Sequence, residues 1–194
     1  MAMLRFLCRT CWSEQMTDSV AKPVLSPERW ATATTFAQYV AKMTVNRDTM
    51  LRYVDEVEID PADIEWWKSQ GKLNVLVLTF DGCGDALYNI PVMAKIAAQC
   101  PNIDLRVVQR DENLDIMDRY RNQGIYRSVP TFIFMDSYLV EIGNLKERPE
   151  QLSVIVEQEM IKVRRRLREE NKVPWRAELA RELRAVVAEH KRYP

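Results

Sequence analysis

The middle of the chain alternates between short apolar runs and apolar stripes at helical spacing. The run LNVLVLTF, residues 73–80, is nearly continuous and bounded by turn residues, as in a strand covered on both faces. Further runs predict strands at 103–109, 131–135 and 138–143. The last two must form a hairpin, because only two residues separate them. Helical stripes follow the first and second runs, and a longer helix follows the fourth.

This order reads β-α-β-α-β-β-α. A right-handed crossover should make the first two strands parallel, whereas the hairpin makes the last two antiparallel. The pattern therefore predicts an α/β fold with three layers, α/β/α, around a mixed sheet. We assign residues 73–160 to this core.

The flanking regions differ from the core. Residues 1–25 show no periodicity and are expected to be a loose tail. Residues 26–72 predict a helical prefix, with one stripe from Trp30 to Met43 and two further helices. Its expected N-caps are Ser26, Asn46 and Asp60.

Residues 161–194 predict a helical extension that Pro174 divides into two helices. The stripes over 149–172 and 175–191 are longer than the core requires. Each apolar stripe must be covered, because an apolar face left in water is a liability. Either the chain's own domain or a second copy can cover it, so a homodimer contact through these helices is one of two alternatives.

Composition narrows the class of protein. Basic and acidic residues both number 28 among 194, so net charge gives no reason to expect nucleic acid or an acidic membrane as partner. No apolar run approaches the roughly 20 residues of a membrane span. The start, MAMLRFLCRTCW, is too short and too charged for a signal peptide. We therefore expect a cytoplasmic protein with reduced cysteines.

Four cysteines are present. Cys8 and Cys11 form a Cys-x-x-Cys that resembles half of a zinc site, but a closed site needs about four ligands. We interpret this pair as part of a leader. Cys100 ends a predicted helix and is expected to be a buried apolar residue. Cys83 is the thiol in a position suited to chemistry.

Cys83 lies between Gly82 and Gly84, after the first strand and at the start of the first crossover helix. The N–H groups at a helix start stabilise a thiolate. The carboxylates of Asp81 and Asp85 oppose this effect. We therefore expect a thiol that is at most mildly activated, and a partner that abstracts its proton would have to come from elsewhere in the fold.

A second motif, Ser128-Val129-Pro130-Thr131, comes just before the third strand. Proline is tolerated at the first residue of a strand, and Pro130 is a candidate for a cis peptide bond. The crossover geometry should bring Val129 and Pro130 beside Cys83.

These motifs resemble the thioredoxin superfamily over about residues 73–160. The resemblance rests on Cys83 at a helix start, Pro91 eight residues later, the Val129-Pro130-Thr131 motif and the order of elements. CGDALYNIPVMAKIA and QRDENLDIMDRY are similar to a bacterial thioredoxin-like family in which a Cys-Gly-Asp motif replaces the usual Cys-x-x-Cys.

The resemblance implies that Cys83 is the attacking cysteine and that Ala86 occupies the position of the resolving cysteine. It also implies that Val129 pairs through its backbone with an extended substrate, beside Pro130 and Thr131, with Gly82 and Gly84 lining the same site. Several departures remove parts of the dithiol machinery. Asp85 replaces the usual proline, Gly82 the usual tryptophan, and Val77 an aspartate that is often buried.

Three functions remain open at this point. In the first, Cys83 forms a mixed disulfide with a protein or a low-molecular-weight thiol, which an external thiol resolves. This favours thiol–disulfide oxidoreductase activity and requires no cofactor. In the second, the protein is a redox-inactive binding module that uses the groove beside Pro130. In the third, less favoured, it is a monothiol iron–sulfur carrier.

Two other patterns are interpreted as structural. Residues 81–85, DGCGD, have the oxygen alternation of a calcium loop, but Val92 stands where the final glutamate would be, so no metal is expected. KVRRRLREENK, residues 162–172, resembles a nucleic-acid patch. Its interleaved glutamates and helical spacing favour a solvated helix face instead.

Overall fold

The computed structural model describes residues 22–170 and residue 177. Its four strands form one mixed sheet in the order β2-β1-β3-β4. The strands are β1 (Leu73–Thr79), β2 (Ile103–Gln109), β3 (Thr131–Met135) and β4 (Glu141–Lys146). Strand β1 is parallel to β2 and antiparallel to β3, and β3 is antiparallel to β4. The predicted α/β class and mixed sheet are confirmed.

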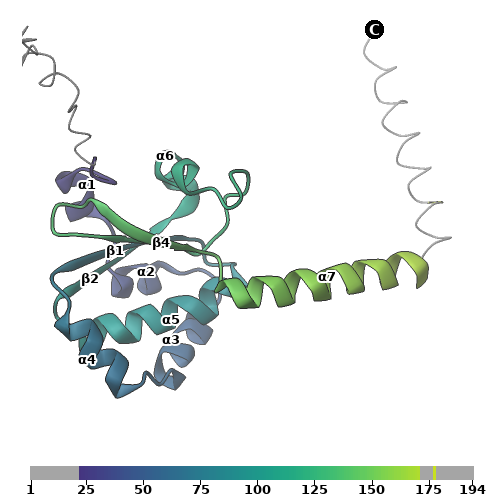
Figure 1. The fold of residues 1–194 in the computed structure, drawn as a ribbon, viewed down its shortest axis with the longest axis horizontal. Coiled ribbons are helices and arrows are strands. Elements are labelled where there is room, and N and C mark those ends of the chain that lie inside the picture. Colours follow the sequence, from purple (N-terminus) through teal and green to yellow (C-terminus); the bar gives the residue numbers. More distant parts are fainter. Residues whose placement is uncertain (1–21, 171–176, 178–194) are drawn as a thin grey trace, which may run out of the picture. The chain divides into compact units, whose positions relative to one another are not determined.

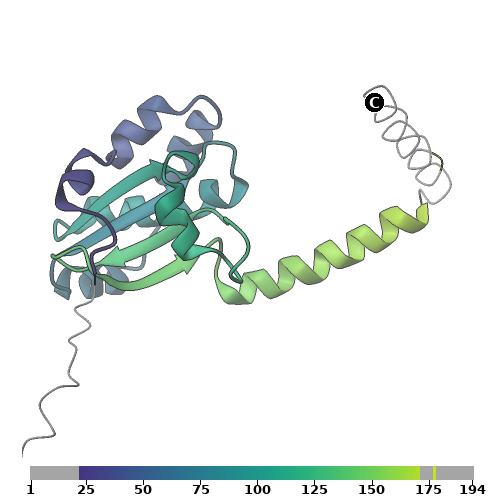
Figure 2. The same ribbon diagram turned by 90° about the horizontal axis from the view of Figure 1, so that it is seen from above.

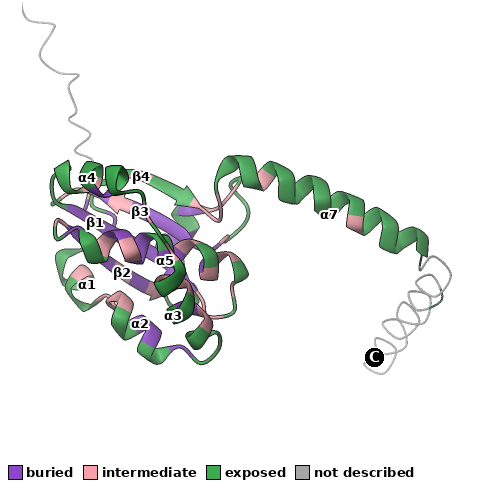
Figure 3. Ribbon diagram, turned by 90° about the horizontal axis from the view of Figure 1, so that it is seen from below, coloured by how far each residue is buried: buried purple, intermediate pink, exposed green. Residues whose placement is uncertain are grey.

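Strand β1 is buried along its whole length because helices cover both faces of the sheet (Figures 1 and 3). Val75 and Val77 share one apolar cluster with the long helix α5 (Gly84–Gln99). Leu76 and Leu78 belong to a second cluster on the other face, with residues of α6 (Leu114–Met117). Alternate residues of a strand point to opposite faces, so one continuous apolar run fills two cores.

The helical prefix contains four helices, α1 (Pro27–Thr32), α2 (Phe36–Lys42), α3 (Arg47–Glu56) and α4 (Pro61–Ser69). The predicted single stripe from Trp30 to Met43 is therefore wrong, because it is broken at residues 33–35. There the backbone joins the sheet: the Val107 N–H donates to the Thr34 carbonyl at 2.8 Å, and Thr35 forms a bridge with Arg106. Hydrogen bonds between residues 34–35 and the edge of β2 therefore replace the helix that the stripe predicted.

Two of the expected N-caps are confirmed. The Ser26 hydroxyl accepts from the Arg29 N–H, and the Asp60 carboxylate accepts from the Ala62 N–H. Asn46 is also at an N-cap position, but its side chain does not cap the helix. It has a left-handed backbone, φ 62°, and its side-chain amide donates to the Asp81 carbonyl at 2.9 Å. The residue joins the prefix to the loop that carries Cys83.

The structure changes the expected boundary of the N-terminal tail. Val24 and Leu25 belong to the core, because both are buried and the Val24 N–H donates to the Leu139 carbonyl at 2.8 Å. The ribbon seen from above shows this segment running beside the sheet (Figure 2). The remainder of the predicted tail, with Cys8 and Cys11, lies outside the described residues.

Strand β4 begins three residues later than predicted. Asp136 accepts hydrogen bonds from the N–H groups of Tyr138 and Val140, and Leu139 has a positive φ of 63°. Residues 136–140 therefore form the turn. Leu139 lies in this turn and not in a strand. Its side chain is buried in the apolar cluster that contains Leu76 and Leu78.

The chain forms two compact units, residues 1–147 and 148–194. The prefix, the sheet and the helices on both of its faces belong to the first unit. The second contains α7 (Glu150–Glu170), which has no buried residue. Its start agrees with the sequence prediction. The helix expected over 175–191 lies outside the described residues, apart from residue 177.

Candidate functional site

The candidate site is built where β1 ends and α5 begins. Residues Phe80–Cys83 form a turn in which the Cys83 N–H donates to the Phe80 carbonyl at 3.2 Å. A Cβ at position 82 would lie 3.0 Å from Cε2 of Phe80, so a larger residue there requires the Phe80 ring to shift. Cys83 is the N-cap of α5, and Gly84 is the first residue of the helix. Both glycines are exposed, whereas the Cys83 side chain is half-buried.

The sulfur of Cys83 meets the segment before β3. Its Sγ–H donates to the Val129 carbonyl at 3.2 Å, and the Val129–Pro130 peptide bond is cis, as predicted. Val129, Pro130 and Thr131 are all buried, and the Thr131 hydroxyl donates to the Ser128 carbonyl at 2.8 Å. Cys83 and Val129 are 46 positions apart in the sequence. They form one site because β1 and β3 are neighbours in the sheet.

The electrostatic surroundings disfavour the thiolate. Burial raises the pKa of the Cys83 thiol above its ordinary value, and the backbone N–H groups of Ala86 and Asp85 at the helix start oppose this shift. The carboxylates of Asp85 and Glu147 raise the pKa further. The balance leaves Cys83 mainly protonated at neutral pH, which agrees with the expectation of a poorly activated thiol.

Glu147 was not identified from the sequence. Its N–H donates to the Pro130 carbonyl at 2.7 Å, and its carbonyl and carboxylate accept from the side-chain amides of Asn89 and Asn122. The register of the β3–β4 hairpin is the sequence feature from which the position of Glu147 could have been predicted. Thr131 pairs with Lys146, the last residue of β4, so Glu147, which follows it, must face Pro130. The strand predicted over 138–143 ends too early, so it did not indicate that Glu147 lies opposite Pro130.

Asp81 has a different role from the one expected. Its carboxylate accepts hydrogen bonds from the Thr44 N–H at 2.8 Å, the Thr44 hydroxyl at 3.3 Å and the Gln109 side-chain amide at 3.1 Å. Burial acts to raise the pKa of Asp81, but these hydrogen bonds lower it overall. Asp81 therefore connects the prefix and β2 to the Cys83 loop, while Asp85 and Glu147 act on the thiol.

The position of the usual second cysteine holds Ala86, which is buried in the first turn of α5. Cys100, at the other end of α5, is completely buried, with its sulfur 3.8 Å from the Ile64 carbonyl. Among residues 22–170, Cys83 therefore lacks a nearby thiol. In the same part of the chain, no group of three or more His, Cys, Asp or Glu side chains is arranged to hold a metal ion.

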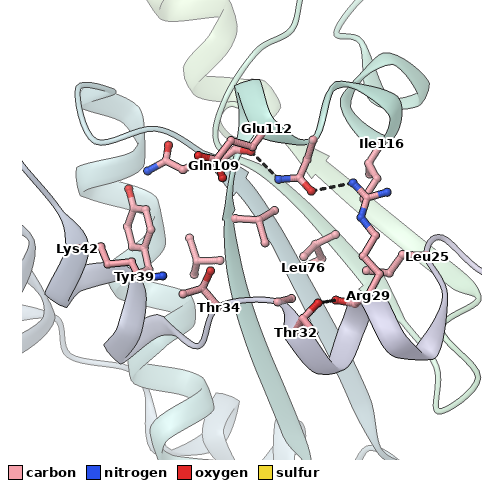
Figure 4. A pocket seen from close by; sticks show the side chains of 14 residues that line it. Leu25, Arg29, Thr32, Thr34, Tyr39, Lys42, Leu76, Gln109, Glu112 and Ile116 are labelled. Atoms are coloured by element: carbon pink, nitrogen blue, oxygen red, sulfur yellow. Dashed lines mark hydrogen bonds between the residues drawn. The ribbon is translucent and has the colours of Figure 1, made fainter.

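A separate cavity of about 500 Å³ lies between the prefix and the β2 end of the sheet (Figure 4). Arg29 of α1 lines one side of it and donates to the Asn113 side chain at 2.8 Å and to the Asp115 carboxylate. Gln109, which also lines the cavity, donates to Asp81. Cys83, Val129 and Pro130 are not among the lining residues, so the cavity is distinct from the thiol site.

None of the helices in the described part of the chain is long and apolar enough to cross a membrane.

The comparisons with known proteins agree with this geometry. A family model described as thioredoxin matches residues 33–164, so the chain belongs to the thioredoxin family. The match begins within the helical prefix and extends into α7. Helices α2, α3 and α4 of the prefix therefore lie within the region that the family model matches, whereas α1 precedes it.

Solved structures show the same fold. A Pseudomonas aeruginosa protein of unknown function is 17% identical, with a TM-score of 0.60 over 72% of this chain and 87% of the other. An HIV epitope-scaffold is 18% identical, with a TM-score of 0.55 over 64% and 78%. These identities establish similarity of fold alone. A search of curated proteins gave no significant match.

Proposed function

We propose that this thioredoxin-family protein carries out monothiol thiol–disulfide exchange through Cys83. The observation that carries the proposal is the half-buried Cys83 sulfur, 3.2 Å from the Val129 carbonyl and beside the cis Pro130. The site offers one half-buried thiol beside the Val129–Pro130 segment, with an exposed glycine on each side of it for access. Thiol–disulfide exchange requires only a thiolate and access to the disulfide.

In the proposed reaction, Cys83 first loses its proton to solvent. The thiolate attacks one sulfur of a disulfide, a new Sγ–S bond forms, and the original S–S bond breaks. The leaving sulfur departs as a thiolate and takes up a proton. Cys83 is oxidised to a mixed disulfide while the leaving thiol is reduced.

The second half of the cycle needs another molecule. Ala86 provides no thiol three residues after Cys83, so an external protein or low-molecular-weight thiol must attack the mixed disulfide. That attack reduces Cys83 and forms a new disulfide on the incoming thiol. A bacterial cytoplasm, where small thiols are kept reduced, is the compartment that we propose for this cycle.

A redox-inactive binding module is the second candidate. The raised pKa of Cys83 favours it, because a protonated thiol is a poor nucleophile. In this function the Val129 and Pro130 segment would bind an extended partner, and the Cys83 thiol would serve only as a hydrogen-bond donor.

Adduct formation separates the two functions. Cys8 and Cys11 are further thiols of the chain, so the test uses a Cys8→Ser, Cys11→Ser background, with oxidised glutathione as the disulfide and intact-protein mass as the readout. We expect one glutathione per chain, removed by dithiothreitol and absent after Cys83→Ser. Buried Cys100 is the internal control and should stay unmodified in the folded protein. If Cys83 forms no adduct up to about pH 8.5, the ordinary pKa of a free thiol, the monothiol function is wrong.

A further inference from the structure

Helix α7 carries an apolar stripe along one side. Its members recur at spacings of four, four, three and four residues, and they are Leu152, Val156, Met160, Val163 and Leu167. At 3.6 residues per turn they lie within an arc of about 80°. Leu152 and Met160 are 50% and 45% exposed, and Figure 3 shows the helix exposed along most of its length. We call this set of five residues the α7 stripe.

The α7 stripe is symmetric about its own centre. Leu152 and Leu167 lie equally far from a point between residues 159 and 160, as do Val156 and Val163, and Met160 lies beside that point. If the helix is turned end over end, Leu152 exchanges places with Leu167 and Val156 with Val163, while Met160 stays next to the centre. A two-fold axis near Met160 would therefore match the stripe to itself, as an isologous interface between two copies requires.

The charges of α7 also favour an antiparallel arrangement of two α7 helices. Residues 150–160 contain three glutamates and no basic residue, whereas residues 161–170 contain five basic residues and two glutamates. The two halves thus have formal charges of −3 and +3. Antiparallel pairing places each acidic half against a basic half, whereas parallel pairing would juxtapose like charges along the whole helix.

We propose that α7 is a dimerisation helix that pairs antiparallel with α7 of a second copy, with the two-fold axis near Met160. The repeat of 11 residues, from Leu152 to Val163 and from Val156 to Leu167, corresponds to about 3.67 residues per turn. Two helices with this spacing keep their stripes in contact with little supercoiling. The inference is independent of the redox chemistry proposed for Cys83.

Sedimentation velocity of the full chain in reducing buffer tests the interface, and two adjacent substitutions provide a matched pair. Met160→Glu places a charge in the α7 stripe, whereas Ile161→Glu places one on the opposite side, where Ile161 is 57% exposed. We expect Met160→Glu to raise the dimer dissociation constant at least about tenfold, and Ile161→Glu to change it less than about threefold. Circular dichroism confirms that both variants retain their helix content.

A charge-reversed variant tests the orientation. Glu157→Lys with Glu159→Lys changes the formal charge of the first half of α7 from −3 to +1. In an antiparallel dimer this half now faces a basic half, so the dissociation constant should rise. In a parallel dimer the substitution reduces repulsion between the first halves, and the constant should fall.

If the inference is right, mixing the Lys variant with a second variant of opposite charge should restore dimerisation. Arg164→Glu with Arg166→Glu makes the second half acidic, at −1, and this variant should also dimerise poorly alone. An equimolar mixture of the two charge variants should form a heterodimer. A wild-type monomer at about 100 μM, equal effects of Met160→Glu and Ile161→Glu, or tighter dimerisation of the Lys variant would each overturn the inference.

Discussion

The Sγ–H of Cys83 donates a hydrogen bond to the carbonyl of Val129 across 3.2 Å. This contact joins the N-terminus of α5 to the segment that precedes β3, and it holds the thiol beside Pro130. A hydrogen bond donated by the thiol stabilises the protonated form and is lost on ionisation. The resting state of the site is therefore a neutral thiol that must lose both a proton and this contact before it reacts.

The pH dependence of Cys83 reactivity should reflect this environment. Burial and the carboxylates of Asp85 and Glu147 raise its pKa, so the midpoint of alkylation by iodoacetamide should lie above that of glutathione in the same buffer. Glu147→Gln removes one negative charge near the thiol and should shift the midpoint to lower pH. Exposed Glu112→Gln is the control and should leave it unchanged. A midpoint below that of glutathione would contradict the assignment.

Introducing a second cysteine should create a dithiol site. Ala86 is buried in the first turn of α5, three residues after Cys83, where the family usually has the resolving cysteine. We expect Ala86→Cys to form an internal disulfide and to gain reduction of a protein disulfide, because release becomes intramolecular. Ala86→Ser is the control of equal size. The prediction fails if Ala86→Cys retains two free thiols at these positions under oxidising conditions.

Asp81 should stabilise the fold in a pH-dependent way. Asp81→Asn weakens charge-assisted hydrogen bonds from Thr44 and Gln109, and we expect a loss of about 1–2 kcal/mol at pH 7 because the site is partly exposed. The pKa of Asp81 is lowered in the folded state, so its contribution is present above the unfolded pKa and is lost as pH falls through the folded pKa.

Urea denaturation of wild type and Asp81→Asn measures this effect. The difference in unfolding free energy should shrink as pH decreases below about 4. Exposed Asp55→Asn serves as the control and should cost less than about 0.5 kcal/mol at pH 7. A difference between Asp81→Asn and wild type that grows toward acid pH would refute the sign of the argument.

The central strand should dominate core stability. Leu76 is completely buried in β1, so Leu76→Ala should cost about 2–5 kcal/mol, through lost apolar burial and the cavity that remains. Leu145 is the same residue type on the edge strand β4 but is 40% exposed. Leu145→Ala should therefore cost less than half as much in the same urea titration. Equal costs would mean that β1 is not the centre of the core.

The sequence alone determined the elements whose signals are local. A continuous apolar run defined β1 because both faces of that strand are covered, and Ser26 and Asp60 defined helix starts because their side chains cap neighbouring N–H groups. Cys83 and the Val129–Pro130 motif could be paired because the order of strands fixes which elements are neighbours.

Only the tertiary structure decided the features that depend on contacts between distant segments. The prefix breaks at residues 33–35 because that backbone pairs with the edge of β2, and Leu139 is buried beside Val24, whose N–H donates to the Leu139 carbonyl. Glu147 reaches the site through the register of a hairpin, and Asp81 faces donors from Thr44 and Gln109. Periodicity records which side of an element is buried, but it does not record which partner covers that side, and these four positions depend on the partner.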